Sequence, residues 1–337
     1  MAYPDGAASA FVPFQEATKV EKLDSHTYRV NLVDAYCISA VPNGGYAGSC
    51  MLAAASAHLS SRGQPDMVTA HFEYPSQTAT GPAIVVVEDV KLARRLSIVH
   101  LTLWQGGLVD HAPWLTASVS RRAVLAYATY TNLRTFSGMS VQTGHEAVAL
   151  ASLPPPPDFT ALKQHGSDAR WKHTKLPSAL NSWRSLRNWC FYIPREDREQ
   201  QLTPGTLEMW IRLASGERIT QGALAYVADS FPWNLHTFLP APGDGAEAQS
   251  AAAQRNNQRT ELWFPTVTLD LEAKMALPQG GVEWLAVLVT SKQIRDGRFD
   301  LDITIRDAEG QLVALSHHVA IIVDIAKNKG NGGKFTL

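Results

Sequence analysis

An acidic residue at the end of a nonpolar segment is the feature of this sequence that most directly suggests chemistry. Asp229 is the last residue of the segment 224–229, which reads LAYVAD. A carboxylate in such surroundings is costly to bury unless it is hydrogen-bonded or used in a reaction. The comparable helical run in the first half, residues 43–59, contains no acidic residue. The sequence therefore predicts that Asp229 belongs to a catalytic site, with a helix cap or a solvent-facing acid as the alternative.

The elements that would position Asp229 occur twice in the chain. Residues 42–59 begin with PNGGY and continue as a helical run of small side chains, and residues 221–239 begin with QGALAY and form a second such run. Each run is followed by segments that alternate between polar and nonpolar residues, at 67–124 and 260–324. The offset of roughly 200 residues is too long for a solenoid repeat and indicates a duplicated domain.

The last two strand-like segments of the two copies compare best. Residues 97–104 correspond to 299–305, and residues 114–118 correspond to 312–316, with a glycine turn between the two strands in each copy. A long helix wrapped by a strongly curved antiparallel sheet is the hotdog architecture. Two copies in one chain predict an α+β double hotdog, in which two curved antiparallel sheets each surround a central helix.

A run of four prolines, residues 154–157, interrupts the pattern between the two copies. Consecutive prolines hold the chain extended and prevent a helix. We therefore expect an N-terminal hotdog over residues 1–153, a linker over residues 154–201, and a C-terminal hotdog over residues 202–337 that carries the site.

The overall composition excludes some classes of partner. The chain has 337 residues, of which 45% are hydrophobic and 18% are charged, and its net charge is -1, so there is no electrostatic reason to expect nucleic acid or an anionic membrane. Cys37, Cys50 and Cys190 are odd in number and far apart, which argues against a disulfide framework or a metal cluster. No targeting segment or membrane span is visible. We expect a cytoplasmic protein without metal or cofactor, and a homo-oligomer is compatible with the fold.

Three segments of the second half, in order, resemble the acyl-CoA thioesterase II group, whose members have the double-hotdog fold. Residues 224–229 (LAYVAD) are similar to its central-helix motif, residues 265–270 (PTVTLD) to a strand with a catalytic threonine, and residues 313–318 (VALSHH) to a strand with a catalytic glutamine. Residues 42–46 (PNGGY) also resemble the wider thioesterase-like superfamily, which includes many fungal proteins. The resemblance covers most of both halves.

The resemblance implies three catalytic residues, Asp229, Thr268 and His318, which would orient and activate a water molecule for attack on a thioester carbonyl. His318 stands where the family has glutamine. Histidine can bind a water as glutamine does, and it can also accept a proton near neutral pH, so the change either preserves hydrolysis or indicates different chemistry. His317 and His318 point to opposite faces of a strand, so only one of them can reach a site.

The N-terminal end of a central helix is expected to bind the carbonyl oxygen of the substrate as this oxygen gains negative charge. Gly44, Gly45 and Tyr46 are one candidate for this substrate-binding role, and residues 222–223 are the other. Close packing of a helix against the sheet explains the glycines equally well.

Trp233 and His236 follow the acid and are expected to line the substrate site near the acyl end, with plain packing as the alternative. A hotdog hydratase would place its acid and its histidine within a D-x-N-P-x-H arrangement. Here His236 lies seven residues after Asp229. This spacing disfavours a hydratase.

Other catalytic motifs are missing from the sequence, which has no G-x-S-x-G, no G-x-G-x-x-G and no P-loop. The first hypothesis is a thioester hydrolase that acts on an acyl-CoA or acyl-carrier thioester in lipid or polyketide metabolism. The alternative is a double-hotdog tailoring enzyme (a dehydratase, isomerase or cyclase) that acts on a polyketide-like substrate, as His318 suggests. A third hypothesis is an acyl-binding module without catalysis.

Overall fold

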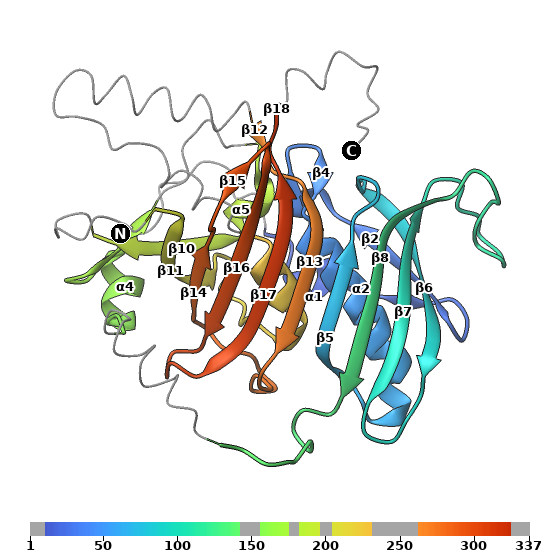
Figure 1. Cartoon of the computed structure of the whole chain (residues 1–337), viewed down its shortest axis with the longest axis horizontal. Helices are drawn as coiled ribbons and strands as arrows, with labels where there is room; N and C mark the ends of the chain where they lie inside the picture. The colour runs from blue at the N-terminus through green and yellow to red at the C-terminus, as the bar shows by residue number, and fades with distance from the viewer. Residues whose placement is uncertain (1–10, 142–155, 175–181, 196–203, 231–261, 325–337) are drawn as a thin grey trace.

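One large antiparallel sheet organises the part of the chain that the structure, a computed structural model, describes: residues 11–141, 156–174, 182–195, 204–230 and 262–324 (Figure 1). Within these ranges the sheet has 14 strands. They are β1 (Glu21–Lys22), β2 (Thr27–Leu32), β5 (Asp66–Glu73), β6 (Gly81–Lys91), β7 (Ser97–Gln105), β8 (Arg121–Thr131), β9 (Trp171–Thr174), β10 (Trp189–Pro194), β11 (Thr206–Leu213), β13 (Thr266–Ala273), β14 (Leu285–Thr290), β15 (Ile294–Arg295), β16 (Arg298–Arg306) and β17 (Leu312–Ile321).

The sheet contains the same arrangement of strands twice, joined edge to edge. The first copy has the order β2-β6-β7-β8-β5 and the second has the order β11-β14-β16-β17-β13. In each copy, the first strand along the chain is followed in space by the third, fourth, fifth and second. The second strands of the two copies, β5 and β13, pair with each other, with His71 opposite Asp270. The chain therefore has the internal duplication that its sequence predicts.

The remaining elements are short, apart from the central helix of the first copy. Two small ribbons pair β3 with β4 and β12 with β18. These shorter strands and the helices are β3 (Cys37–Ile38), β4 (Val41–Pro42), β12 (Leu262–Trp263), β18 (Val323–Asp324), α1 (Phe14–Ala17), α2 (Gly44–Leu59), α4 (Phe159–His165), α5 (Arg184–Arg187), α6 (Leu224–Ala228) and the 3₁₀ turns η1 (Asp34–Tyr36), η2 (Ser60–Arg62) and η4 (Gln221–Ala223). None of the helices in the described ranges has the length and hydrophobicity that crossing a membrane would need.

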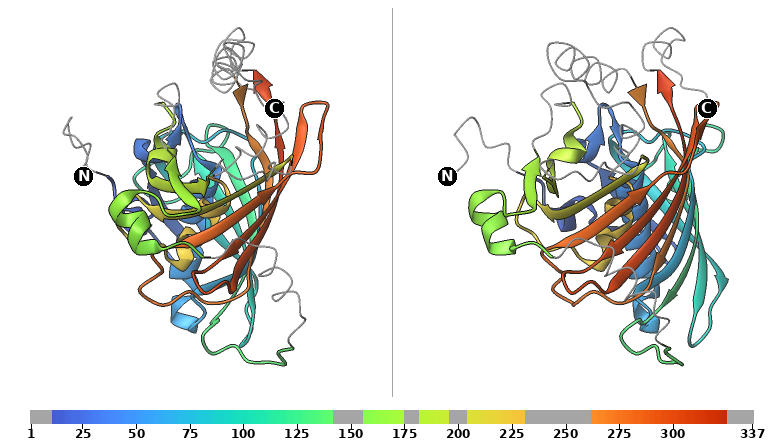
Figure 2. Two further views of the ribbon diagram at one scale, coloured as in Figure 1. Left: turned by 90° about the vertical axis from the view of Figure 1, so that its left-hand side faces the viewer. Right: turned by 60° about the vertical axis from the view of Figure 1, so that its left-hand side comes forward.

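Helix α2 lies on the concave side of the sheet, which curves around α2 and α6 (Figure 2). Asn43 caps its start, because the side-chain oxygen of Asn43 accepts a hydrogen bond from the N–H of Tyr46 at 2.9 Å. Small residues such as Ala47 and Ser49, which are two positions apart and so lie on nearly opposite sides of the helix, are both buried. A helix of small side chains can be surrounded in this way, because the neighbouring elements approach its backbone closely. The hydrophobic core lies between this helix and the sheet.

Helices α2 and α6 approach most closely at Gly45. A Cβ atom at this position would lie 2.1 Å from the backbone oxygen of Ala225 and 2.6 Å from the Cβ of Asp229. Real side-chain carbons do not come this close to a backbone atom, so only glycine fits. Gly45 therefore sets the distance between the central helices of the two copies.

Replacing Gly45 by alanine is expected to lower the free energy of unfolding by about 1–3 kcal/mol, because α2 and α6 would have to move apart. Gly222→Ala is the matched control, since a Cβ at Gly222 meets no atom within 4 Å. Urea unfolding of both variants measures the difference. Equal stability of the two variants would contradict the close approach.

The last strand of the first copy begins later than the sequence predicts. Residues 114–118, expected in that strand, lie in the connection between β7 and β8, and β8 starts at Arg121. Trp114 and Ser118 both have a φ of 67°, which is incompatible with an extended strand. The expected match of residues 114–118 with 312–316 is therefore wrong, and β8 is the counterpart of β17.

The segment expected as a linker, residues 154–201, adds strands to the second copy of the sheet. β10 pairs with β11, and β9 pairs with β10 at the edge. Trp171 and Trp189 are buried in this region. Its described residues, 156–174 and 182–195, are thus part of the packed C-terminal half, while the boundaries of the domains remain a prediction. The second central helix, predicted over residues 222–239, is described only as far as residue 230, where η4 and α6 form its start.

Candidate active site

Asp229 follows α6 directly and lies against the first turn of α2. Its Oδ2 accepts a hydrogen bond from the backbone N–H of Gly45 at 2.7 Å, and its Oδ1 accepts one from the hydroxyl of Thr266 at 2.8 Å. The side-chain amide of Asn43 donates to the backbone carbonyl of Asp229 at 2.8 Å. The acid of the C-terminal half is thus fixed by the helix of the N-terminal half, whose first turn carries the positive end of the helix dipole.

Burial makes the Asp229 carboxyl weaker than an ordinary aspartic acid. The side chain is 10% exposed. Burial raises the pKa of Asp229 to about 6, and the hydrogen bonds from Gly45 and Thr266 act in the opposite direction and limit the rise. A carboxyl group with this pKa is mostly ionised at neutral pH and can still accept and return a proton, which are the properties of a general base.

The N–H groups at the start of α2, predicted to bind a substrate carbonyl, contact groups of the protein instead. The N–H groups of Gly44 and Gly45 hydrogen-bond to the Asp229 carboxylate, and the N–H of Tyr46 donates to Asn43. A Cβ at Gly44 would lie 3.0 Å from Oδ2 of Asp229, so the glycine allows the acid to approach. The first turn of α2 therefore orients the acid.

The hydroxyl group beside the acid comes from Thr266, whereas the sequence predicts Thr268. A β-bulge between Thr266 and Thr268 shifts the pairing of β13 with β17. Thr266 is opposite Ala320, which is buried, and Thr268 is opposite Val319, which is 37% exposed on the outer face. The structure brings Thr266 to the acid and leaves Thr268 on the other side of the sheet. The alternating pattern of the sequence gives no sign of this bulge.

His318 lies on β17 behind the acid and is completely buried. Its Nδ1 is 3.6 Å from Oδ1 of Asp229 and has no hydrogen-bond partner in the described part of the chain. Its Nε2 is 2.9 Å from the hydroxyl of Ser316, which donates its own hydrogen to the backbone oxygen of Asp270. Nε2 must therefore carry the ring hydrogen, and Nδ1 presents its lone pair to the carboxyl group.

Burial lowers the pKa of His318 to about 3, so its imidazole is neutral at ordinary pH. His317 points to the outer face, where its Nδ1 is 2.6 Å from Oδ1 of Asp302. The alternation along β17 thus places one of the two adjacent histidines at the site. In the described ranges no third His, Cys, Asp or Glu joins Asp229 and His318 in a set that could hold a metal ion.

A cavity of about 230 Å³ opens beside the acid. Its polar wall contains Asp229, Thr266, Asn43 and Gly44, while His318 and Thr268 do not line it. The rest of the wall is largely nonpolar and comes from both halves of the chain. It includes Ile38, Val41, Trp183, Leu186, Phe264 and Phe299.

Besides the glycines, Tyr46 is the one predicted substrate-binding residue that lies within the described ranges. Tyr46, in the first turn of α2, is buried and does not line the cavity. Its hydroxyl donates to the backbone oxygen of Ala17 at 2.8 Å. In the alternative helix start, residues 222–223, the N–H of Ala223 donates to Thr220. Trp233 and His236 lie outside the described residues.

A glutamine that no sequence pattern indicates also lines the cavity. Gln77 lies in the connection between β5 and β6. Its side-chain nitrogen is buried and has no hydrogen-bond partner among the described residues. A buried donor without a partner is costly, so a group that accepted a hydrogen bond from this N–H would remove an energetic penalty. An isolated glutamine in a connecting segment carries no sequence signal that would have identified it.

Comparison with known proteins identifies the family. The model of the acyl-CoA thioesterase N-terminal domain matches residues 32–130, and that of the acyl-CoA thioesterase C-terminal domain matches residues 156–322. A thioesterase-like protein of the fungus Talaromyces wortmannii, TwmA, is 58% identical over 96% of this chain and 95% of its own length. The chain belongs to the acyl-CoA thioesterase family. Its members act on acyl thioesters, so the family-level activity is that of a thioester hydrolase.

Solved structures show the fold of this acyl-CoA thioesterase family member. A putative thioesterase II of Thermobifida fusca matches with a TM-score of 0.64 and 18% identity, covering 93% of this chain and 98% of its own. A hotdog-fold protein of Alicyclobacillus acidocaldarius matches with a TM-score of 0.64 and 17% identity, covering 92% and 97%. An acyl-CoA thioesterase II of Mycobacterium marinum matches with a TM-score of 0.58 and 15% identity, covering 94% and 100%. The predicted double hotdog is confirmed.

Proposed function

We propose that the protein hydrolyses an acyl-CoA or acyl-carrier thioester with a water molecule that Asp229 and Thr266 hold in the cavity. The observation that carries this proposal is a buried carboxyl group with a pKa of about 6 on the wall of a largely nonpolar cavity. Each oxygen of the carboxylate has lone pairs beyond those that Gly45 and Thr266 use. A water molecule in the cavity can therefore hydrogen-bond to Asp229.

In the proposed reaction, the water oxygen attacks the carbonyl carbon of the thioester while Asp229 takes a proton from the water. The tetrahedral intermediate then breaks its carbon–sulfur bond, and the proton returns from Asp229 to the sulfur. The products are a carboxylic acid and a thiol. The lone pair on Nδ1 of His318 faces Oδ1 and stabilises the protonated form of Asp229 that exists between these steps.

The negative charge that develops on the carbonyl oxygen needs hydrogen-bond donors. The first turn of α2 directs its N–H groups to protein atoms, so it is not available for this purpose. The buried side-chain nitrogen of Gln77 on the cavity wall is a donor without a protein partner among the described residues. In our proposal, Gln77 binds the carbonyl oxygen and the nonpolar walls hold the acyl chain.

The alternative as a dehydratase, isomerase or cyclase has less support. This alternative is based on the histidine that stands in place of glutamine. A dehydratase, isomerase or cyclase that used this histidine as an acid or base would need it to contact the substrate. His318 lies behind Asp229 and does not line the cavity. Hydrolysis does not need this histidine to contact the substrate, because Asp229 and Thr266 line the cavity themselves.

Release of free thiol from a panel of acyl-CoA and acyl-carrier thioesters tests the proposal, with a thiol-reactive chromophore as readout. We expect kcat/KM to be constant above neutral pH and to fall tenfold for each pH unit well below about pH 6. The reason is that only the ionised Asp229, whose pKa is raised to about 6, can accept the proton. A pH profile that stays flat down to pH 5, or no thiol release from any thioester, would contradict the proposal.

A further inference from the structure

A second cluster of polar side chains lies at the opposite end of α2 from the active site. It contains His26 from the turn between β1 and β2, His58 from the last turn of α2, and Asp89 from β6. A helix rises by about 1.5 Å per residue, so His58 is roughly 21 Å from Gly44 along the axis. The cluster is therefore separate from the cavity that Asp229 lines.

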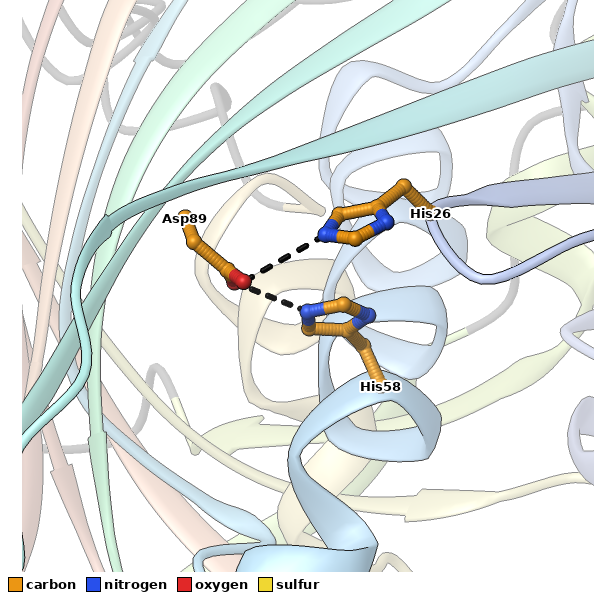
Figure 3. Close-up of side chains that lie close together, drawn as sticks. All are labelled: His26, His58 and Asp89. Atoms are coloured by element: carbon orange, nitrogen blue, oxygen red, sulfur yellow. Dashed lines mark hydrogen bonds and ion pairs between the residues drawn. The ribbon is translucent and has the colours of Figure 1, made fainter.

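The two imidazole rings and the carboxylate converge on one point (Figure 3). Nε2 of His58 is 2.8 Å from Oδ1 of Asp89, and Nε2 of His26 is 3.3 Å from Oδ2. One ligand atom from each residue lies within 4.8 Å of the other two. Donor atoms around a tetrahedral zinc ion, with bonds of about 2.0–2.2 Å, are roughly 3.3–3.6 Å apart. The observed spacing can adapt to an ion through small side-chain rotations.

The other nitrogen of each ring is held by the same residue, Ser25. Nδ1 of His58 is 3.1 Å from the backbone oxygen of Ser25, which can only accept, and Nδ1 of His26 is 2.8 Å from the Ser25 hydroxyl. The shorter contact, to Ser25, therefore favours a hydrogen on Nδ1 of His58, which the Tyr28 hydroxyl also approaches at 3.5 Å. Metal-binding histidines typically donate this second N–H to a carbonyl or carboxylate, which fixes the direction of the lone pair on the other nitrogen.

With the hydrogen of His58 on Nδ1, a neutral ring directs the lone pair of Nε2 at a carboxylate oxygen. This arrangement is repulsive unless a positive species lies between the two atoms, either a proton or a metal ion. His58 is in the last turn of α2, where the helix dipole also favours positive charge.

We propose that His26, His58 and Asp89 form a binding site for a divalent transition-metal ion, with Zn²⁺ as the ion that two imidazoles and a carboxylate favour. The ion enters from solvent past His26, whose side chain is 46% exposed, and water completes its coordination. Once bound, it ties the end of α2 to β6 and to the β1–β2 turn. The site is structural and takes no part in thioester hydrolysis.

Calorimetric titration of chelator-treated, full-length protein with ZnCl₂ at pH 7.5 tests the proposal. We expect one ion per chain and a rise in Tm with Zn²⁺. His26→Ala and Asp89→Asn should each weaken binding at least about tenfold and remove the rise in Tm. His100→Ala is the matched control, because His100 contacts a single carboxylate, that of Glu88, and its loss should leave the affinity unchanged.

The result that overturns the proposal is the absence of zinc binding, or an affinity that His26→Ala does not change. Either would show that the three side chains form only a protonated ion pair. His26 is half exposed, so its variant is expected to fold even where Asp89→Asn does not. Thiols do not confuse the measurement, because the free cysteines, Cys37, Cys50 and Cys190, are all buried.

Discussion

Replacing Asp229 by asparagine is expected to lower kcat for thioester hydrolysis by about a thousandfold, the scale of a lost general base. The amide has nearly the shape of the carboxylic acid but cannot accept the proton of the attacking water. Its oxygen can still accept from Gly45, and its nitrogen can donate to Thr266. The pocket therefore stays formed, and the loss reports on chemistry. Thiol release measured with saturating substrate gives the comparison.

The same substitution is expected to stabilise the fold at neutral pH. The folded-state pKa of Asp229 is raised from 3.8 to about 6, so the charged form is disfavoured in the folded state. The stability that this group contributes is complete below about pH 4 and is lost as the pH rises through 6. At pH 7 this loss is about 3 kcal/mol, from about 1.36 kcal/mol per pKa unit. Asp229→Asn should remove it and raise the Tm.

Asp270→Asn is the control for both effects, because its carboxylate is 53% exposed on the outer face of the same sheet. This variant should keep full activity and show no stabilisation at neutral pH. If Asp229→Asn retained activity, or lost activity together with stability, the role of Asp229 as a buried base would be wrong.

The second large effect is expected from Thr266 and not from Thr268. Thr266→Val removes the hydrogen bond to Oδ1 of Asp229, and hydrogen bonds to charged groups contribute about 1.5–3 kcal/mol. This energy corresponds to roughly a ten- to a hundredfold change, so we expect kcat/KM at pH 6 to fall by about that factor. The pKa in the pH profile of kcat/KM should rise. Thr268→Val should leave both quantities unchanged within about twofold, since surface changes are small.

This pair of variants also decides between two interpretations of the strand. The resemblance to acyl-CoA thioesterase II places the catalytic threonine at Thr268, and the hydrogen bond places it at Thr266. A loss of activity in Thr268→Val with normal activity in Thr266→Val would show that the bulge between them is absent in the working enzyme.

The sequence predicts the duplicated fold and the acid because both leave local signals. The repeated helix starts and alternating strands reveal the double hotdog, and a carboxylate after five nonpolar residues reveals Asp229. The partners of Asp229 leave no such signal. Thr266 depends on a bulge, and the contact with Gly45 depends on how the two central helices meet. The sequence pattern does not predict strands β9 and β10, because they follow the polyproline run and are flanked by polar residues.

The metal-binding cluster shows the same limit. His26, His58 and Asp89 are far apart in the sequence and match no ligand spacing. Only the packing of α2 against β6 and the β1–β2 turn brings them together. A short sequence motif can identify functional residues that lie on one helix or strand. A site whose residues come from three elements can be recognised only in the tertiary structure.

The contact between the Asp229 carboxylate and the start of α2 has a consequence for the symmetry of the enzyme. The twofold scaffold could support two equivalent reactive centres, one at the start of each central helix. Each centre would need an acid from the opposite copy, and residues 43–59 provide none. In the proposed mechanism, each chain therefore has a single centre, to which both copies contribute. The proposed proton acceptor of one copy and the glycines of the other therefore depend on each other for their positions.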